Sequence, residues 1–78
     1  MVREKVAKIL AEIIDIDWED ISPETDWTKE YDLKAVHIAK LVIECEKEFK
    51  IIIHDEDVHT FSCVNDVVEY IKRIQFDR

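Results

Sequence analysis

Side chains that could take part in chemistry are sparse in this 78-residue sequence, and the thiol of Cys63 is the most reactive type among them. Cys63 lies just before a segment with helical periodicity, and a thiol at a helix N-terminus tends to have a lowered pKa. It could accept an acyl group, although a small half-buried residue is the plainer interpretation. Cys45 lies among apolar residues and is interpreted as core. Two cysteines do not make a disulfide framework.

Two clusters carry side chains of the kinds that bind metal ions. Residues 15–19 have carboxylates at alternate positions, as calcium loops do, but Asp20 stands where the sixth position of such a loop needs glycine. His54, His59 and Cys63 lack the paired spacing of zinc sites. No catalytic triad or metal-hydrolase motif is visible. We therefore predict no metal site and no enzyme activity.

The composition excludes several classes of function. The sequence holds no glycine and one proline, Pro23, so it lacks the turns of all-β folds and the loops of P-loop and dinucleotide-binding proteins. A net charge of −8 disfavours nucleic acids and anionic membranes and favours basic protein partners. The first residues lack the apolar run of a signal peptide, and no segment is long enough to span a bilayer. We therefore expect a cytoplasmic protein without membrane insertion.

Apolar residues at helical spacing predict the elements that position these side chains. Helices are predicted from about Val2 to Ile14, from Leu33 to Phe49 and from Val64 to Gln75. Asp32 and Ser62 are the expected N-caps of the second and third. The sequence thus predicts an all-α fold, a small bundle of three main helices plus one short helix, in a single domain of residues 1–78.

The segments between the helices differ in character. Residues 51–53 are β-branched but have no partner strand, so we expect an extended loop, and the carboxylates of residues 55–57 suit the first turn of the short helix. Residues 15–32 carry a net charge of −7 and form a long connection. Trp18, Trp27 and Tyr31 within it are interpreted as lids on the core. With no glycine, the corners at Asp15, Asp32 and Lys50 must use other residues.

The second predicted helix has one polar stripe on an otherwise apolar surface. The stripe is formed by Lys34, His37, Lys40, Glu44 and Lys47. So wide an apolar arc predicts a helix largely enclosed by its neighbours.

Five stretches resemble the acyl carrier protein family and together cover nearly the whole chain. They are residues 9–13; residues 16–26, close to the family's ID-x-ED-I-S/T-PET-D loop; residues 46–53, close to EEEFGIEI; residues 54–57, close to PDED; and residues 64–71, close to VGDVVDYI. Their order and spacing together are specific. The resemblance implies a helical carrier that holds acyl groups on a phosphopantetheine arm and docks on enzymes of acyl metabolism.

The sequence departs from the family where the arm would be attached. In the family, a serine in a D-S-L motif opens the second helix and carries the arm, and ungapped matching places Ala35 on that serine. Alanine offers no nucleophilic atom, and neither Ser22 nor Ser62 can be brought into register. Lys34, His37 and Lys40 replace the acidic residues of the family's docking stripe, which inverts its charge.

We therefore expect an acyl-carrier-like domain without a phosphopantetheine cofactor, which acts as a protein-interaction or regulatory module linked to fatty acid, polyketide or related acyl metabolism. It is expected to be a monomer with protein partners, among them enzymes of acyl metabolism. By resemblance, the partner-binding face comprises Lys34, Val36, His37, Lys40, Ile52, Asp55 and Glu56. An ordinary solvated helix face is the alternative interpretation of the charged stripe.

The second function left open is binding of a lipid or acyl group without the arm, either non-covalently or through Cys63. The pocket would be lined by Leu41, Cys45, Phe49, Ile53 and Ile71. A plain packed core is the alternative interpretation of these residues.

Overall fold

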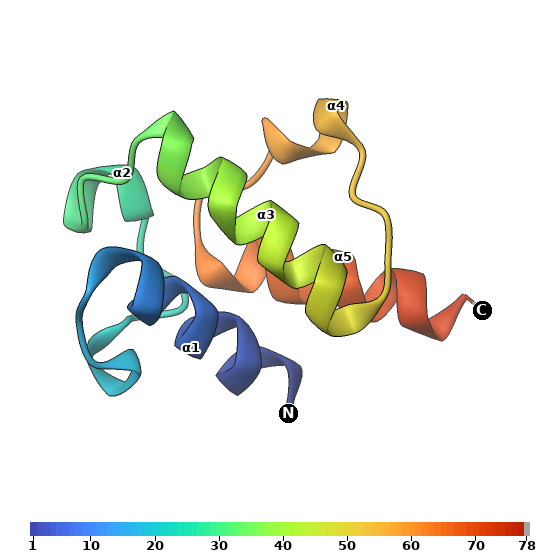
Figure 1. The fold of residues 1–78 in the computed structure, drawn as a ribbon, viewed down its shortest axis with the longest axis horizontal. Coiled ribbons are helices and arrows are strands. Elements are labelled where there is room, and N and C mark those ends of the chain that lie inside the picture. Colours follow the sequence, from blue (N-terminus) through green and yellow to red (C-terminus); the bar gives the residue numbers. More distant parts are fainter. Residues whose placement is uncertain (78) are drawn as a thin grey trace.

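The computed structural model describes residues 1–77, and all of its regular elements are helices (Figure 1). They are α1 Val2–Ile14, the 3₁₀-helix η1 Trp18–Asp20, α2 Trp27–Glu30, α3 Ala35–Phe49, α4 Asp55–Val58 and α5 Val64–Phe76. The predicted all-α class is confirmed. The sequence pattern missed η1 and α2, because elements of three and four residues are too short to show helical periodicity.

Helix α1 packs against both α3 and α5, and these three helices enclose the core (Figure 1). Val6 and Leu10 on α1 lie one turn apart and are fully buried, and they meet Leu41 of α3 and Ile71 of α5 in one apolar cluster. Burying a side chain of this size stabilises the fold by about 1.5–3 kcal/mol. This periodic burial explains why α1 has the bounds that its sequence predicts.

The three corners expected without glycine are confirmed. Asp15, Asp32 and Lys50 have φ angles of 59°, 52° and 55°, in the left-handed region that usually requires glycine. At two of them the backbone N–H closes the preceding helix: Asp15 donates to the carbonyl of Ala11, and Lys50 donates to that of Glu46. The corners therefore serve as C-terminal caps.

The acidic connection, residues 15–32, packs against the core through its aromatic residues. Trp27 is 1% exposed, so it belongs to the core and is not the lid that the sequence indicated, whereas Trp18 and Tyr31 are half-buried. The backbone N–H of Trp27 donates to the carbonyl of Ser62, at 2.9 Å. Oδ1 of Asp26 accepts from the hydroxyl of Thr28 and also caps α2 by accepting from the N–H of Thr28. These bonds, the hydroxyl's first, lower the pKa of the Asp26 carboxyl.

The second helix begins two residues later than predicted, whereas the third begins at Val64 as predicted. The predicted N-caps of both helices are wrong. Asp32 is left-handed and cannot be an N-cap, so α3 begins at Ala35 with Lys34 as its N-cap. Before α5, the N–H and hydroxyl of Ser62 both donate to Oδ2 of Asp66, at 2.8 and 2.9 Å. Ser62 therefore lies one position before the N-cap, which is Cys63.

Candidate functional site

The short segment that leads into α3 is buried at Leu33 and exposed at the residues that follow. Leu33 is buried, and its N–H donates to the carbonyl of Trp27 at 3.3 Å. The next three residues, Lys34, Ala35 and Val36, are exposed. The start of α3 is thus anchored through Leu33 and presents its first turn to solvent.

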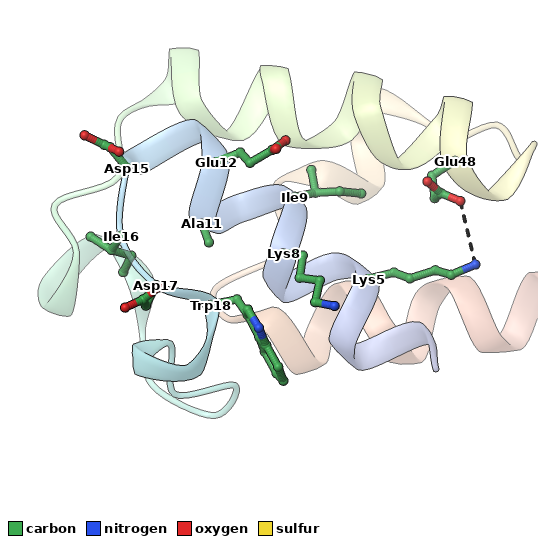
Figure 2. A pocket seen from close by; sticks show the side chains of 10 residues that line it. All are labelled: Lys5, Lys8, Ile9, Ala11, Glu12, Asp15, Ile16, Asp17, Trp18 and Glu48. Atoms are coloured by element: carbon green, nitrogen blue, oxygen red, sulfur yellow. Dashed lines mark ion pairs between the residues drawn. The ribbon is translucent and has the colours of Figure 1, made fainter.

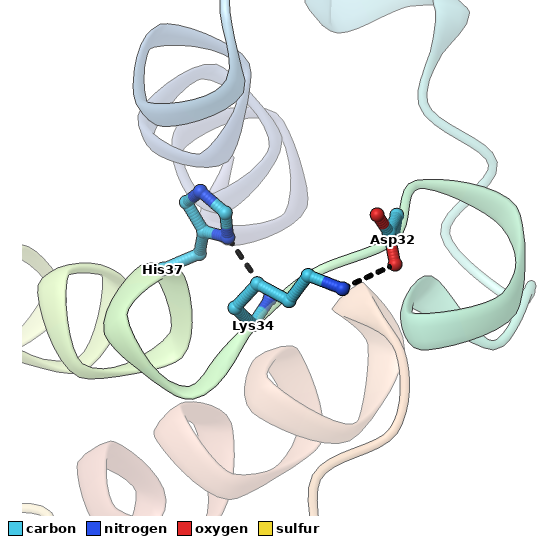
Figure 3. Close-up of polar contacts among 3 residues, drawn as sticks. All are labelled: Asp32, Lys34 and His37. Atoms are coloured by element: carbon cyan, nitrogen blue, oxygen red, sulfur yellow. Dashed lines mark hydrogen bonds and ion pairs between the residues drawn. The ribbon is translucent and has the colours of Figure 1, made fainter.

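Asp32, Lys34 and His37 form a polar cluster at this point (Figure 3). The Lys34 ammonium donates to Oδ1 of Asp32 at 2.8 Å, and this contact lowers the pKa of the Asp32 carboxyl. The backbone N–H of Lys34 donates to Nδ1 of His37 at 2.9 Å. His37 therefore reaches back from the third position of α3 to the N-cap backbone, as Glu or Gln does in a capping box.

This histidine cap should stabilise the start of α3. His37→Ala removes the acceptor for the N–H of Lys34, and the loss of a helix cap costs about 1 kcal/mol in the free energy of unfolding. Urea unfolding followed by circular dichroism is the measurement.

A matched variant isolates this effect. His37→Gln keeps a side-chain acceptor that can reach the N–H of the N-cap residue, as Gln does in a capping box, so it should be less destabilised than His37→Ala. His59→Ala, at an exposed histidine beyond α4, should leave the stability unchanged. Equal stability of His37→Ala and the native chain would contradict the cap.

The residues at the start of α3 do not fit the phosphopantetheine arm that the sequence resemblance implies. A phosphodiester needs a side-chain oxygen, and Ala35, the first residue of α3, presents a methyl group. The serine hydroxyls lie in other elements: that of Ser62 bonds to Asp66 before α5, and that of Ser22 accepts from Thr25 in the acidic connection.

Helix α3 is covered on one side only, which corrects the prediction that its neighbours enclose it. Leu41, Cys45 and Phe49 are buried, but Val36 is 56% exposed and Ile43 is 49% exposed. The physical reason is that residues 1–77 hold too few elements to surround this helix: α1 packs on its inner face, where the buried residues of α3 join those of α5 in one core, and the four-residue α4 covers little of the rest.

An open apolar groove of about 670 Å³ runs between α3 and the segment around α4. Its α3 wall includes Ile38, Ala39, Val42 and Ile43, and Phe61 is among its other lining residues. Sequence reasoning assigned these α3 residues to a generic apolar arc. The pairs Ile38/Val42 and Ala39/Ile43 are each four residues apart, and this spacing was the sequence signal that they share one side of the helix.

Most of the predicted acyl-pocket residues lie elsewhere. All five are 8% exposed or less and pack in the core, and only Ile53 also lines the groove. The plain core interpretation of the other four, Leu41, Cys45, Phe49 and Ile71, is therefore the one that the structure supports.

Residues 51–58 carry the other three residues of the predicted partner face, and hydrogen bonds to α3 and α5 hold this segment in place. The N–H of Ile53 donates to Oε2 of Glu46 at 2.9 Å, and the hydroxyl of Tyr70 donates to Oδ2 of Asp57 at 2.7 Å. Ile51 and Ile53 point inward, whereas Ile52 between them is 72% exposed. This alternation confirms the predicted extended segment before α4.

Ile52, Asp55 and Glu56 are all exposed. They come from the 51–54 segment and α4, whereas Lys34, Val36, His37 and Lys40 come from α3 and the residue before it. Of the predicted face only Asp55 lines the groove, whereas Lys40 lines a separate hollow between α1 and α3.

Neither cysteine has an activated thiol. Burial raises the pKa of Cys45 to about 12, and it also raises the pKa of Cys63, against the prediction made from its place at a helix N-terminus. Desolvation outweighs the backbone N–H groups of Asn65 and Asp66, which act in the opposite direction. Both cysteines are free thiols.

A second hollow, of about 480 Å³, lies beside α1 (Figure 2). Lys8 lies over the ring of Trp18, 5.3 Å from its centroid, and also contacts Glu4 at 3.4 Å. Lys5 reaches Glu48 of α3 at 3.7 Å. Both cations of the hollow therefore already have internal partners.

Within residues 1–77, no three His, Cys, Asp or Glu side chains gather in a way that could hold a metal ion. No helix of that range has the length and apolar composition that a membrane span requires.

Comparison with known proteins gives a consistent result. Residues 4–71 match the family described as "Phosphopantetheine attachment site". The acyl carrier protein of Clostridium acetobutylicum is 38% identical over 72 residues, covering 92% of this chain and 94% of that protein. The acyl carrier protein of Nitratidesulfovibrio vulgaris is 30% identical over 74 residues, covering 95% and 97%.

A solved structure of acyl carrier protein from Enterococcus faecalis is similar to this chain with a TM-score of 0.74 at 30% identity, covering 90% of this chain and 89% of that one. These relatives are named as ordinary acyl carrier proteins, without mention of a lost attachment site.

Proposed function

The chain belongs to the acyl carrier protein family, and from this premise we propose that it is a divergent member that no longer carries the phosphopantetheine arm. Members of this family are carriers and not enzymes. In this proposal the chain acts as a non-catalytic interaction or regulatory module in fatty acid, polyketide or related acyl metabolism. Residues 1–78 form one cytoplasmic, monomeric domain whose partners include enzymes of that metabolism.

The observation that carries the proposal is the side chain at the first position of α3. Ala35 is exposed there, as an attachment residue would have to be, but it has no oxygen to esterify. The neighbouring side chains support the same conclusion. Lys34 brings an ammonium to the position, and His37 brings an imidazole whose Nδ1 accepts a hydrogen bond. The carboxylates with which acidic carriers attract a basic enzyme surface are therefore missing there.

Intact mass tests this proposal directly. The purified chain is incubated with coenzyme A and a broad phosphopantetheinyl transferase, with the Clostridium acetobutylicum carrier protein as the positive control. We expect the control to gain the mass of the arm and this chain to keep its own. A mass gain on this chain, at any residue, refutes the proposal.

The groove beside α3 favours a second candidate function, non-covalent binding of a lipid or acyl chain. Its apolar wall and open mouth supply the surface that such a chain needs. The role of Cys63 in this alternative is weakened, since burial raises its pKa. Native mass spectrometry after incubation with a fatty acid or an acyl-coenzyme A distinguishes the candidates, because only this one predicts a complex that Val42→Glu in the groove abolishes.

A further inference from the structure

The hollow beside α1 offers apolar surface that is separate from the start of α3 (Figure 2). We call it the α1 hollow; its lining comes from α1, from residues 15–18 and from Glu48 near the end of α3. Its apolar part includes Ile9, Ile16 and Trp18, and Ile16 is 38% exposed. Neither Ala35 nor any residue of the predicted partner face lines it. It is therefore a distinct surface whose apolar side chains are partly open to solvent.

The charged groups of the α1 hollow are paired unequally. Both of its lysines have contacts within the chain, Lys5 with Glu48 at 3.7 Å and Lys8 with Glu4 at 3.4 Å. The other carboxylates of the lining are exposed and form no ion pair within residues 1–77; they are Glu12, Asp15 and Asp17. Figure 2 shows Asp15 and Asp17 at the opposite end of the hollow from the Lys5–Glu48 pair. That end of the hollow is therefore negative.

The end of α1 adds to this negative charge. A helix C-terminus carries the negative end of the helix dipole and is stabilised by basic side chains. The last turn of α1 has no basic residue, and Asp15 is its C-cap. Acidic groups thus lie where the helix favours cations, and a cation supplied by a partner would interact favourably with both the carboxylates and the dipole.

We propose that the α1 hollow binds a basic segment of a partner protein, which places an apolar side chain against Ile16 and Trp18 and lysine or arginine side chains beside Asp15 and Asp17. Charge complementarity selects this occupant, because every charged group of the hollow that lacks an ion pair within residues 1–77 is a carboxylate. In that range no three acidic side chains gather as a metal site requires, so these carboxylates suit separate cationic side chains. Nucleic acids and anionic lipids would be repelled by them.

A displayed peptide library tests the proposal. Each peptide has a central leucine, and the flanking positions are randomised among Lys, Gln and Glu. We expect selection on the full chain to enrich Lys at these positions. Because the net charge of −8 attracts basic peptides to the whole surface, the most enriched peptide is then synthesised, and its dissociation constant is measured on matched variants.

The first variant neutralises the negative end of the hollow by combining Glu12→Gln, Asp15→Asn and Asp17→Asn. It should weaken binding of the peptide by about tenfold or more. Asparagine tolerates the left-handed conformation of Asp15, so the corner after α1 should be kept. Ile16→Ser, which removes apolar surface from the hollow, should also weaken binding.

A control variant removes the same amount of charge elsewhere. It combines Glu24→Gln, Glu30→Gln and Glu69→Gln, which are exposed positions outside the lining of the hollow. Because distant surface charges are screened by salt, it should weaken binding by less than about threefold. Circular dichroism of each variant checks that the helices are retained.

The inference is overturned if no peptide binds, if the selected peptides carry no excess of Lys, or if the control variant weakens binding as much as the variant of the hollow does. It goes beyond the proposed function, because it concerns a surface that does not include Ala35. A mass gain in the transferase assay would refute the proposed function and leave this inference standing.

Discussion

The variant that combines Lys34→Asp, Ala35→Ser, Val36→Leu and His37→Asp should accept a phosphopantetheine arm, which the native chain should not accept. It supplies a hydroxyl at the exposed first position of α3 and replaces the two basic neighbours by acids. Acids in the first turn also interact favourably with the helix dipole, so α3 should remain intact. Intact mass after incubation with coenzyme A and a transferase is the measurement.

Two further variants show which part of the change matters. Ala35→Ser alone should be modified more slowly, by about tenfold or more, because the chain still lacks carboxylates at positions 34 and 37 that would attract a basic enzyme surface. Ala39→Ser adds a hydroxyl at another exposed alanine, one turn along the same helix, and should stay unmodified. If the combined variant gains no mass, Ala35 is not the family's attachment position.

Trp27→Ala should be the most damaging single change in the acidic connection. The indole is 1% exposed and lies in the apolar core, and truncating such a side chain costs about 3–5 kcal/mol. A domain of this length has a total stability of only roughly 4–12 kcal/mol. We therefore expect a variant that is partly unfolded at room temperature, as urea unfolding followed by circular dichroism would show.

Trp27→Phe is the control that separates volume from hydrogen bonding. The indole Nε1 of Trp27 is buried without a hydrogen-bond partner within the described residues, and removing an unpaired buried donor relieves a penalty of about 1–3 kcal/mol. This gain offsets part of the lost volume, so the net cost should stay near 1 kcal/mol. Equal destabilisation by Phe and Ala would show that the indole N–H is satisfied.

Features of the candidate site that depend on the type of one residue could be predicted from the sequence. Features that depend on how far a side chain is exposed could not. The absence of an oxygen at Ala35 is a property of the sequence, and it needs no coordinates. The environment of Cys63 is different, because the helix-terminus argument lowers its pKa while burial raises it. Only the packed chain decides which of these two effects is larger.

The same division holds for the fold. Apolar spacing determined the three long helices, and the lack of glycine determined that Asp15, Asp32 and Lys50 would turn the corners, since backbone conformation and helix periodicity are local properties. Which face of each helix would be covered was decided by the tertiary structure. The sequence pattern of α3 is the same whether Val36 and Ile43 are buried or exposed. They are exposed because α1 packs on the inner face of α3, and within residues 1–77 no helix of comparable length packs on its other face.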